Sequence, residues 1–317
     1  MSEAKKLLSM KFFFTFLKCF FLSLLFSLAA CSSESGELDI YNKTDVKTTK
    51  TWNQETETLI HDGIVREYVL YIPSDYDEAI TYPLMFNFHG FGGEAVQYIS
   101  YADMRSLADR ENFILVYPQG TLSSGSPHWN PSLPSSNNKS DANDLDFVES
   151  LIRELSSHYN IDLERVYACG FSNGGMMAYG LAQHKSDLIA GIASVSGVML
   201  ESDVNPTHPM PVFIIHGTSD AVLPYNGNGY YNSIQSTIDF WKDFNNINTD
   251  AEKNNETING ITIEHYLFDS GDQGVSVEHY KVTGGDHVWF DIQYQGNDTA
   301  TLIWDFLSKF DINGLID

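Results

Sequence analysis

Residues 166–178 read VYACGFSNGGMMA and place Ser172 at the centre of a Gly-x-Ser-x-Gly pattern. The residues just before the pattern, 165–169, are mostly apolar and strand-forming, whereas residues 175–182 lack proline and repeat apolar side chains at helical spacing. A serine between such a strand and helix sits on a sharp turn, and the flanking glycines let the two elements approach closely. The sequence therefore predicts a strand, a tight turn and a helix that present the Ser172 hydroxyl as a nucleophile.

The chain on both sides of this turn alternates apolar strands with helices. Continuous apolar runs of this kind are typical of parallel strands that are buried on both faces. They predict an α/β fold with a mostly parallel central sheet, an N-terminal antiparallel hairpin and helices on both faces, all within one catalytic domain over residues 53–317. The expected strands are 56–61, 66–72, 82–88, 113–118, 165–169, 188–198, 211–216, 261–268 and 275–282; the expected helices are 95–110, 144–159, 175–182, 232–245 and 299–310; and residues 119–143 are expected to form a long functional loop.

Residues 1–30 have the features of a bacterial lipoprotein signal peptide. A basic start precedes an apolar run over residues 12–30, which is too short and too interrupted for a stable membrane span. The run ends in Leu-Ala-Ala-Cys, which resembles the signal whose cysteine, here Cys31, becomes the lipidated first residue of the mature chain. An ordinary secretory peptide and a signal anchor are the alternatives. Residues 31–52 are polar and aperiodic, so we expect a flexible tether and a lipid-anchored position at the outer membrane of the bacterial cell envelope.

The chain is strongly acidic, with a formal net charge of −24. Residues 1–30 carry four lysines and one glutamate, so the remainder has a net charge of −27. Such a charge repels nucleic acid and anionic lipid surfaces, and it favours neutral substrates. We therefore expect contact with a membrane only through a lipid on Cys31. Cys169 is the one cysteine after Cys31, which leaves no disulfide framework. Its position beside the turn predicts a small buried core residue.

A serine nucleophile needs an acid that holds its general base, and Asp220 is the best candidate for that acid. In folds that contain this strand-turn-helix pattern, the acid follows the serine along the chain and precedes the histidine. It must also lie in a loop at the carboxyl end of a strand, because that edge of an open parallel sheet carries the active site. Asp220 follows the apolar strand 211–216 and meets both conditions. Asp203, Asp243 and Asp272 lie in polar or helical settings, where a solvated carboxylate is the ordinary explanation.

The general base is predicted to be His287. Three histidines follow Asp220 in the chain, and His265 and His279 fall inside alternating strands. His287 lies instead in the glycine-rich loop TGGDHVW, directly after the strand 275–282. We therefore expect Ser172, His287 and Asp220 to form a catalytic triad.

The remaining site residues are predicted from their positions relative to the triad. An oxyanion is bound by backbone N–H groups, here from Asn173, which follows the nucleophile, and from the loop HGFGG at 89–93, where Phe91 is the best donor. Aromatic faces stack on acyl groups and on sugars, although each such residue could equally belong to the core or cap the surface. The candidates for a substrate pocket are Trp129, Tyr101, Tyr225 and Trp289.

Five segments together resemble one known family. They are HGFGG at 89–93, YPQG at 117–120, GFSNGGMMA at 170–178, HGTSD at 216–220 and GGDHVW at 284–289, and they resemble the polyhydroxybutyrate depolymerase and feruloyl esterase family of α/β-hydrolases. The resemblance covers about residues 60–310. It implies the α/β-hydrolase fold and a secreted or lipid-anchored serine esterase, with Ser172, Asp220 and His287 in the triad positions. It implies no metal and no cofactor, and we expect a monomer.

Two departures from the family pattern narrow the expected substrate. Family members often have a proline where this chain has Phe290. Depolymerases that attack solid polymer commonly carry disulfides and an added binding domain, which have no counterpart in this sequence. We therefore expect a soluble feruloyl, acetyl or similar ester of plant polysaccharide. The alternatives are a polyhydroxyalkanoate depolymerase, a peptidase of the prolyl oligopeptidase type, and a catalytically silent surface lipoprotein that binds glycan.

Overall fold

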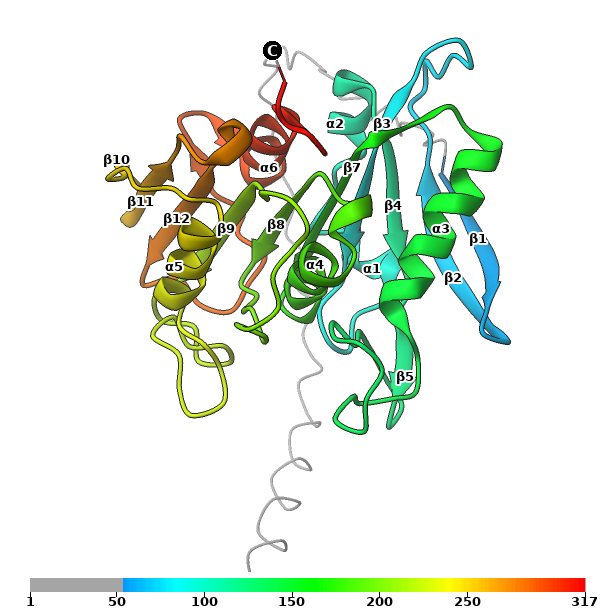
Figure 1. Ribbon diagram of the computed structural model, residues 1–317, viewed down its shortest axis with the longest axis horizontal. Helices are drawn as coiled ribbons and strands as arrows, with labels where there is room; N and C mark the ends of the chain where they lie inside the picture. Colours follow the sequence, from blue (N-terminus) through cyan, green and yellow to red (C-terminus); the bar gives the residue numbers. More distant parts are fainter. Residues whose placement is uncertain (1–53, 317) are drawn as a thin grey trace, which may run out of the picture. The chain divides into compact units, whose positions relative to one another are not determined.

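The computed structural model describes residues 54–316. The chain divides into two units, Met1–Thr49 and Lys50–Asp317, and the described residues belong to the second. The predicted signal peptide, Cys31 and the tether over residues 31–52 lie outside the described residues, so these assignments stay predictions. Figure 1 gives the arrangement of the described elements.

A ten-stranded sheet runs through the described domain in the order β1-β2-β4-β3-β7-β8-β9-β12-β11-β10 (Figure 1). The six central strands, from β4 to β12 in that order, are parallel to one another, and the edge strands pair antiparallel. The predicted mostly parallel sheet with an N-terminal hairpin is therefore confirmed. The sheet strands are β1 (Gln54–His61), β2 (Ile64–Tyr71), β3 (Tyr82–Phe88), β4 (Ile114–Pro118), β7 (Ile161–Phe171), β8 (Gly191–Val195), β9 (Val212–Gly217), β10 (Glu252–Ile258), β11 (Ile261–Phe268) and β12 (Val277–Thr283).

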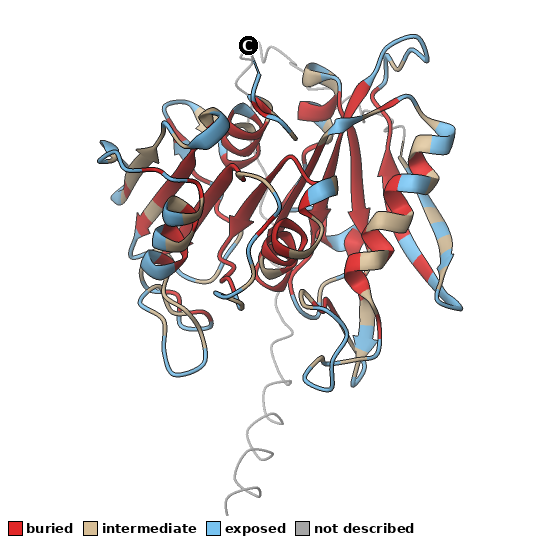
Figure 2. Cartoon of the chain, viewed as in Figure 1, coloured by how far each residue is buried: buried red, intermediate tan, exposed pale blue. Residues whose placement is uncertain are grey.

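Helices cover both faces of the sheet and divide the core into two apolar clusters. One cluster packs beneath α3 (Asp144–His158), α4 (Asn173–His184) and α5 (Ile234–Phe244). The other packs beneath α1 (Ala95–Tyr98), α2 (Arg105–Glu111) and α6 (Thr299–Leu307). Figure 2 shows the central strands mostly buried and the helices buried on the side that faces the sheet. Cys169 is fully buried in the second cluster, as predicted.

Short elements complete the described chain. Three two-stranded ribbons are β5 (Thr121–Ser123) with β6 (Ser126–His128), β13 (Gln293–Tyr294) with β14 (Asn297–Asp298), and β15 (Phe310–Asp311) with β16 (Gly314–Leu315). Two short 3-10 helices are η1 (Ser186–Leu188) and η2 (Asp272–Gly274). Within residues 54–316, none of the helices has the length and apolar character that a membrane crossing requires.

The structure differs from the sequence prediction at three elements. The predicted helix 95–110 is two helices, because the Met104 N–H donates to the Tyr117 hydroxyl at 2.9 Å and not to a preceding turn. The predicted loop 119–143 contains the β5–β6 ribbon. Strand β10 was not predicted, because its sequence EKNNETI is polar on both faces and carries no apolar alternation.

The close approach of α4 to the sheet explains a glycine of the Gly-x-Ser-x-Gly pattern. A Cβ atom placed on Gly174 would lie 2.0 Å from the carbonyl oxygen of Phe88 in β3, far inside van der Waals contact. Only glycine therefore lets the first turn of α4 rest on the end of β3.

We expect Gly174→Ala to destabilise the fold, because the added methyl group must push helix and strand apart. The free energy of unfolding should fall by about 1–3 kcal/mol, the usual cost of overpacking. Urea denaturation would measure it, with Gly229→Ala as the matched control, since no atom lies within 4 Å of a Cβ at that position. Equal effects of the two substitutions would contradict this account.

Candidate active site

Ser172 sits on a strained turn between β7 and α4. Its φ is +55° and its ψ −116°, a conformation that residues other than glycine rarely adopt. The turn is held from behind, because the Ser172 N–H donates to the carbonyl of Val195 in β8 at 2.9 Å. The side chain is thereby presented at the carboxyl end of the sheet, and the residue is 8% exposed.

Three side chains from separate loops meet at this edge of the sheet. Ser172 follows β7, Asp220 follows β9 and His287 follows β12. The Ser172 hydroxyl donates to His287 Nε2 at 2.9 Å, and His287 Nδ1 donates to Asp220 Oδ2 at 2.7 Å. A carboxylate can only accept, so the proton of the neutral imidazole lies on Nδ1 and Nε2 is free to take the serine proton. The structure thus brings together all three residues that the sequence predicted as the triad.

Asp220 is held as an anion by a dense set of donors. Its Oδ1 accepts from the backbone N–H groups of Val222 at 2.9 Å and Leu223 at 2.8 Å. Burial alone would raise the pKa of the Asp220 carboxyl, but hydrogen bonds from its two histidine neighbours and from the Leu223 amide hold that pKa well below its usual range. The carboxylate therefore stays ionised and can stabilise an imidazolium on His287.

The second histidine beside Asp220 is His216, whose role the sequence analysis missed. It is fully buried at the end of β9, with Nε2 3.2 Å from Asp220 Oδ2 and 2.8 Å from the Leu223 carbonyl oxygen. Both neighbours are acceptors, so Nε2 carries the proton. Its Nδ1 has no hydrogen-bond partner among residues 54–316. The available signal was its position four residues before the acid, in the segment HGTSD.

The two predicted oxyanion donors adjoin Ser172. Asn173 is the first residue of α4, so its N–H has no acceptor within that helix. The amides of Gly92 and Gly93 donate to the carbonyls of Pro127 and Gly90, whereas no acceptor is seen for the Phe91 N–H among the described residues. A Cβ placed on Gly90 would lie 3.3 Å from Ser172 Cβ, so the peptide before Phe91 borders the nucleophile. Both amides therefore have no acceptor among the described residues, as a donor to an oxyanion requires.

A buried network fixes the loop that carries Phe91. His89 Nδ1 donates to the Gly90 carbonyl at 2.7 Å, and His89 Nε2 accepts from the Gly120 amide at 3.0 Å. Burial lowers the pKa of His89 to about 4, so the ring is neutral with its proton on Nδ1. Trp129 Nε1 donates to the His89 carbonyl at 2.9 Å, and the Trp129 amide donates to Asn173 Oδ1 at 2.8 Å. Trp129 thereby joins the two halves of the oxyanion site.

A family model described as phospholipase/carboxylesterase matches residues 81–256, more than half of the chain. The chain belongs to this family of α/β-hydrolases. The predicted fold is therefore confirmed. The matched residues include the strand-turn-helix that carries Ser172.

Similar proteins agree with the predicted resemblance to feruloyl esterases. A putative esterase NocK from Nocardia uniformis is 35% identical over 148 residues, 46% of this chain and 42% of the relative. A bifunctional acetylxylan esterase/xylanase from Neocallimastix patriciarum is 33% identical over 51% of this chain and 22% of its own length. A probable feruloyl esterase C from Aspergillus clavatus is 30% identical over 51% of this chain and 57% of its own length. The chain thus spans less than two thirds of the length of each of these relatives.

Solved structures show the same fold at lower identity. An acetyl xylan esterase from Aspergillus awamori superposes with a TM-score of 0.57 at 18% identity, over 74% of this chain and 93% of that one. A ferulic acid esterase from Anaeromyces mucronatus gives a TM-score of 0.53 at 17% identity, over 84% of this chain and 93% of that one. At these identities the superpositions show the shared fold alone.

Two cavities of the hydrolase lie beside the triad. One, of about 370 Å³, contains both Tyr101 and Trp289, which the sequence predicted as substrate-binding residues. The Tyr101 ring packs edge-on against Phe171, whose ring centroid lies 5.1 Å from that of His287, so two ring contacts connect the wall of this cavity to His287. The other cavity, of about 320 Å³, is lined by Asn173 and Met176 at the start of α4 and also by Trp129.

The other two predicted binding residues face the protein interior. Trp129 is only 1% exposed, so its ring offers little surface to a ligand even though it forms part of a cavity wall. Tyr225 donates its hydroxyl to His279 Nε2 at 2.9 Å and packs against the first apolar cluster of the core. It lines neither of the two cavities beside the triad.

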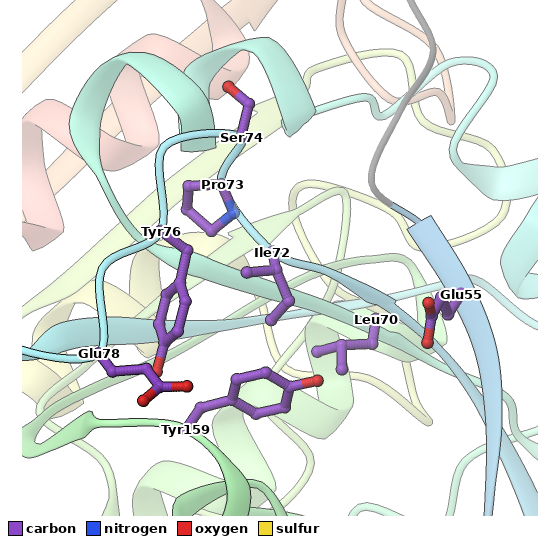
Figure 3. A pocket seen from close by; sticks show the side chains of 8 residues that line it. All are labelled: Glu55, Leu70, Ile72, Pro73, Ser74, Tyr76, Glu78 and Tyr159. Carbon is purple, nitrogen blue, oxygen red and sulfur yellow. The ribbon is translucent and has the colours of Figure 1, made fainter.

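A further cavity, of about 390 Å³, lies away from the reaction site (Figure 3). Tyr76 and Tyr159 form one wall of it, over a floor that includes Leu70 and Ile72. Tyr159 lies two residues before the start of β7, so this cavity lies at the amino ends of the parallel strands. The triad lies at the carboxyl ends, so we exclude this cavity as the place of reaction. Within residues 54–316 there is also no group of three His, Cys, Asp or Glu side chains arranged to hold a metal ion.

Acid should destabilise the folded hydrolase through His89. The unfolded chain takes up a proton near the ordinary value of 6.5, whereas the folded chain keeps this ring neutral until about pH 4. Stability is therefore full above pH 6.5 and falls as the pH drops through that window, by about 1.4 kcal/mol per pH unit for one such group. Urea denaturation at several pH values would measure this slope. Buried His279, whose pKa is lowered to about 3, adds a parallel slope.

His89→Gln should remove about 1.4 kcal/mol per pH unit from the slope between pH 6 and 4.5, because the titrating group is gone. The contribution of His279 remains in both proteins and cancels in the comparison. An unchanged slope in His89→Gln would show that the ring is already charged in the folded protein.

Proposed function

We propose that the protein is a serine carboxylic-ester hydrolase that acts through an acyl-enzyme on feruloyl, acetyl or similar soluble esters of plant polysaccharide. The observation that carries this proposal is the unbroken contact from the Ser172 hydroxyl through the His287 imidazole to the Asp220 carboxylate. Nothing in this chain of contacts has to rearrange before a proton can move.

The proposed reaction follows from the tautomer of His287. Nε2 removes the serine proton as Ser172 Oγ attacks the ester carbonyl, and the developing oxyanion accepts hydrogen bonds from the Phe91 and Asn173 amides. The imidazolium, stabilised by Asp220, then gives its proton to the leaving alcohol. A water molecule activated by Nε2 hydrolyses the acyl-enzyme by the same steps. The pre-aligned amides act on the transition state more than on the planar ester, which is where binding energy accelerates a reaction.

The substrate class is supported by two observations. Proteins that align with about half of this chain include one named as an acetylxylan esterase/xylanase and others named as feruloyl esterases. The cavity next to His287 also presents Tyr101, which is 50% exposed, together with Trp289. Aromatic side chains of this kind can stack on a phenolic acyl group or on a sugar ring.

Ser172→Ala should abolish ester hydrolysis, because no other group on the turn can form the acyl-enzyme. We expect kcat to fall by on the order of 10⁴-fold or more for every substrate that the wild type turns over. A panel of p-nitrophenyl acyl esters, methyl ferulate, acetylated xylan and a 3-hydroxybutyrate oligomer would measure the loss and rank the substrates. Ser157→Ala, at an exposed serine of α3, is the control and should keep full activity.

A folded wild-type protein that hydrolyses no ester and is not labelled at Ser172 by a fluorophosphonate would contradict the proposal. Such a result would favour the glycan-binding alternative. Preferential turnover of the hydroxybutyrate oligomer would favour a polyhydroxyalkanoate depolymerase, and cleavage of a proline anilide would favour a peptidase.

We also propose that the hydrolase is anchored to the outer membrane by lipid on Cys31. The support is the sequence alone, a basic and apolar segment that ends in Leu-Ala-Ala-Cys. Cys31→Ser should move the protein from the membrane fraction to the soluble fraction of the producing cells, as measured by immunoblotting after fractionation. Cys19→Ser, inside the apolar run, is the matched control and should leave the protein with the membranes. An identical distribution of the two variants would reject lipidation at Cys31.

A further inference from the structure

The cavity beside Asn173 contains one basic side chain. This cavity of about 320 Å³ contains Asn173, and Lys139 is the only lysine or arginine among the described residues that line it. The Lys139 ammonium lies 4.6 Å from the centroid of the Phe91 ring, so it sits above the residue that carries the second oxyanion donor. The charge is therefore held at the edge of the reaction site and not at a random point of the surface.

The backbone at Lys139 is fixed by a buried polar network. The Lys139 N–H donates to Asn130 Oδ1 at 3.1 Å, and the Lys139 carbonyl accepts from Ser123 Oγ at 2.9 Å. Asn130 is 2% exposed, and its own N–H donates to Asp144 Oδ2 at 2.7 Å. Asp144 is in turn paired with Arg66 at 2.7 Å in the interior. Hydrogen bonds to both its N–H and its carbonyl thus fix the backbone from which the Lys139 side chain projects.

The positive charge of Lys139 is available to a ligand. No carboxylate of the described residues lies within ion-pairing distance of its ammonium, whose neighbour is an aromatic ring. Glu201 is the acidic residue of the same cavity, and its Oε2 is already 2.5 Å from His184 Nε2. In a chain with 42 acidic and 18 basic side chains, a lysine that has no ion pair among the described residues and shares a cavity with Asn173 sets this cavity apart.

We infer that this cavity binds a carboxylate group of the substrate and that Lys139 is its counter-ion. The inference rests on the proposed esterase function and specifies its substrate: an ester that carries an acid within reach of the reacting carbonyl. The acid could be a uronic acid next to the esterified sugar, or the free end of a dicarboxylic acyl group. The overall negative charge of the protein favours neutral substrates. Salt screens the repulsion between distant acidic side chains and a substrate carboxylate, whereas it screens the attraction between that carboxylate and a lysine in contact with it much less.

Two matched substrate pairs test the inference and separate the two sources of the acid. The first pair is acetylated xylo-oligosaccharides with and without a glucuronic acid side group. The second is p-nitrophenyl hemisuccinate and p-nitrophenyl butyrate, which differ by a carboxylate in place of a methyl group. The readout is the ratio of kcat/KM for the acidic member of a pair to kcat/KM for its neutral member.

Lys139→Met should lower this ratio by about tenfold, the usual effect of losing one hydrogen bond to a charged group. Lys139→Arg should restore most of the ratio, because it keeps the charge. Lys253→Met is the matched control, since Lys253 also lies over a ring, that of Tyr266 at 5.6 Å, but on the edge strand β10. It should keep the wild-type ratio. A fall confined to the first pair assigns the acid to the sugar, and a fall confined to the second assigns it to the acyl group.

The inference is overturned if Lys139→Met changes neither ratio, or if it slows the acidic and neutral members equally. The latter would mean that the lysine only steadies the Phe91 loop. Both results leave the esterase proposal intact, because the neutral esters are still hydrolysed by the wild type. If the wild type hydrolysed none of the four esters, both the esterase proposal and the inference about Lys139 would be overturned. Only this outcome would contradict the esterase proposal.

Discussion

The structure depends on one strained residue, Ser172, whose backbone is held in the left-handed region with φ of +55°. This conformation persists because its surroundings permit no other: α4 rests on the end of β3 where Gly174 has no side chain, and β8 accepts the Ser172 amide. The strain directs the hydroxyl out of the sheet and leaves the first amide of α4 free beside it. Nucleophile and oxyanion donor are thus consequences of the same turn.

Histidines with three different electrostatic tasks surround this turn. His287 is positioned to exchange a proton, with an acceptor and a donor on its two ring nitrogens. His89 is kept neutral by burial and donates to the carbonyl of Gly90, the residue before Phe91. His216 donates toward the carboxylate of Asp220 from inside the core. The three histidines differ in their roles because burial and the hydrogen-bond partner of each ring nitrogen decide whether an imidazole exchanges a proton, orients a loop or donates to a carboxylate.

The sequence predicted the fold and the triad positions because both have local signals. Each triad member follows an apolar strand in a short polar or glycine-rich loop, and parallel strands deliver such loops to one edge. The roles of His89 and His216 were missed. His89 acts through contacts with the loop 119–143 and His216 through contacts within its own loop, and no periodicity of the sequence reports either set. The burial of Trp129 could not be predicted from the sequence either. A tryptophan in a long loop can face solvent or lock the loop to the core, and here its indole N–H and its backbone are both bound.

The polar edge strand β10 has a consequence for how the protein behaves among its own copies. An exposed strand offers unpaired N–H and C=O groups that can template another chain, and alternating apolar side chains would reinforce that association. The sequence EKNNETI instead places charges and amides on both faces of this edge. A fibril or sheet-to-sheet stack built on β10 would have to bury these charges without partners. The same lack of apolar pattern that hid the strand from prediction therefore protects the molecule against aggregation.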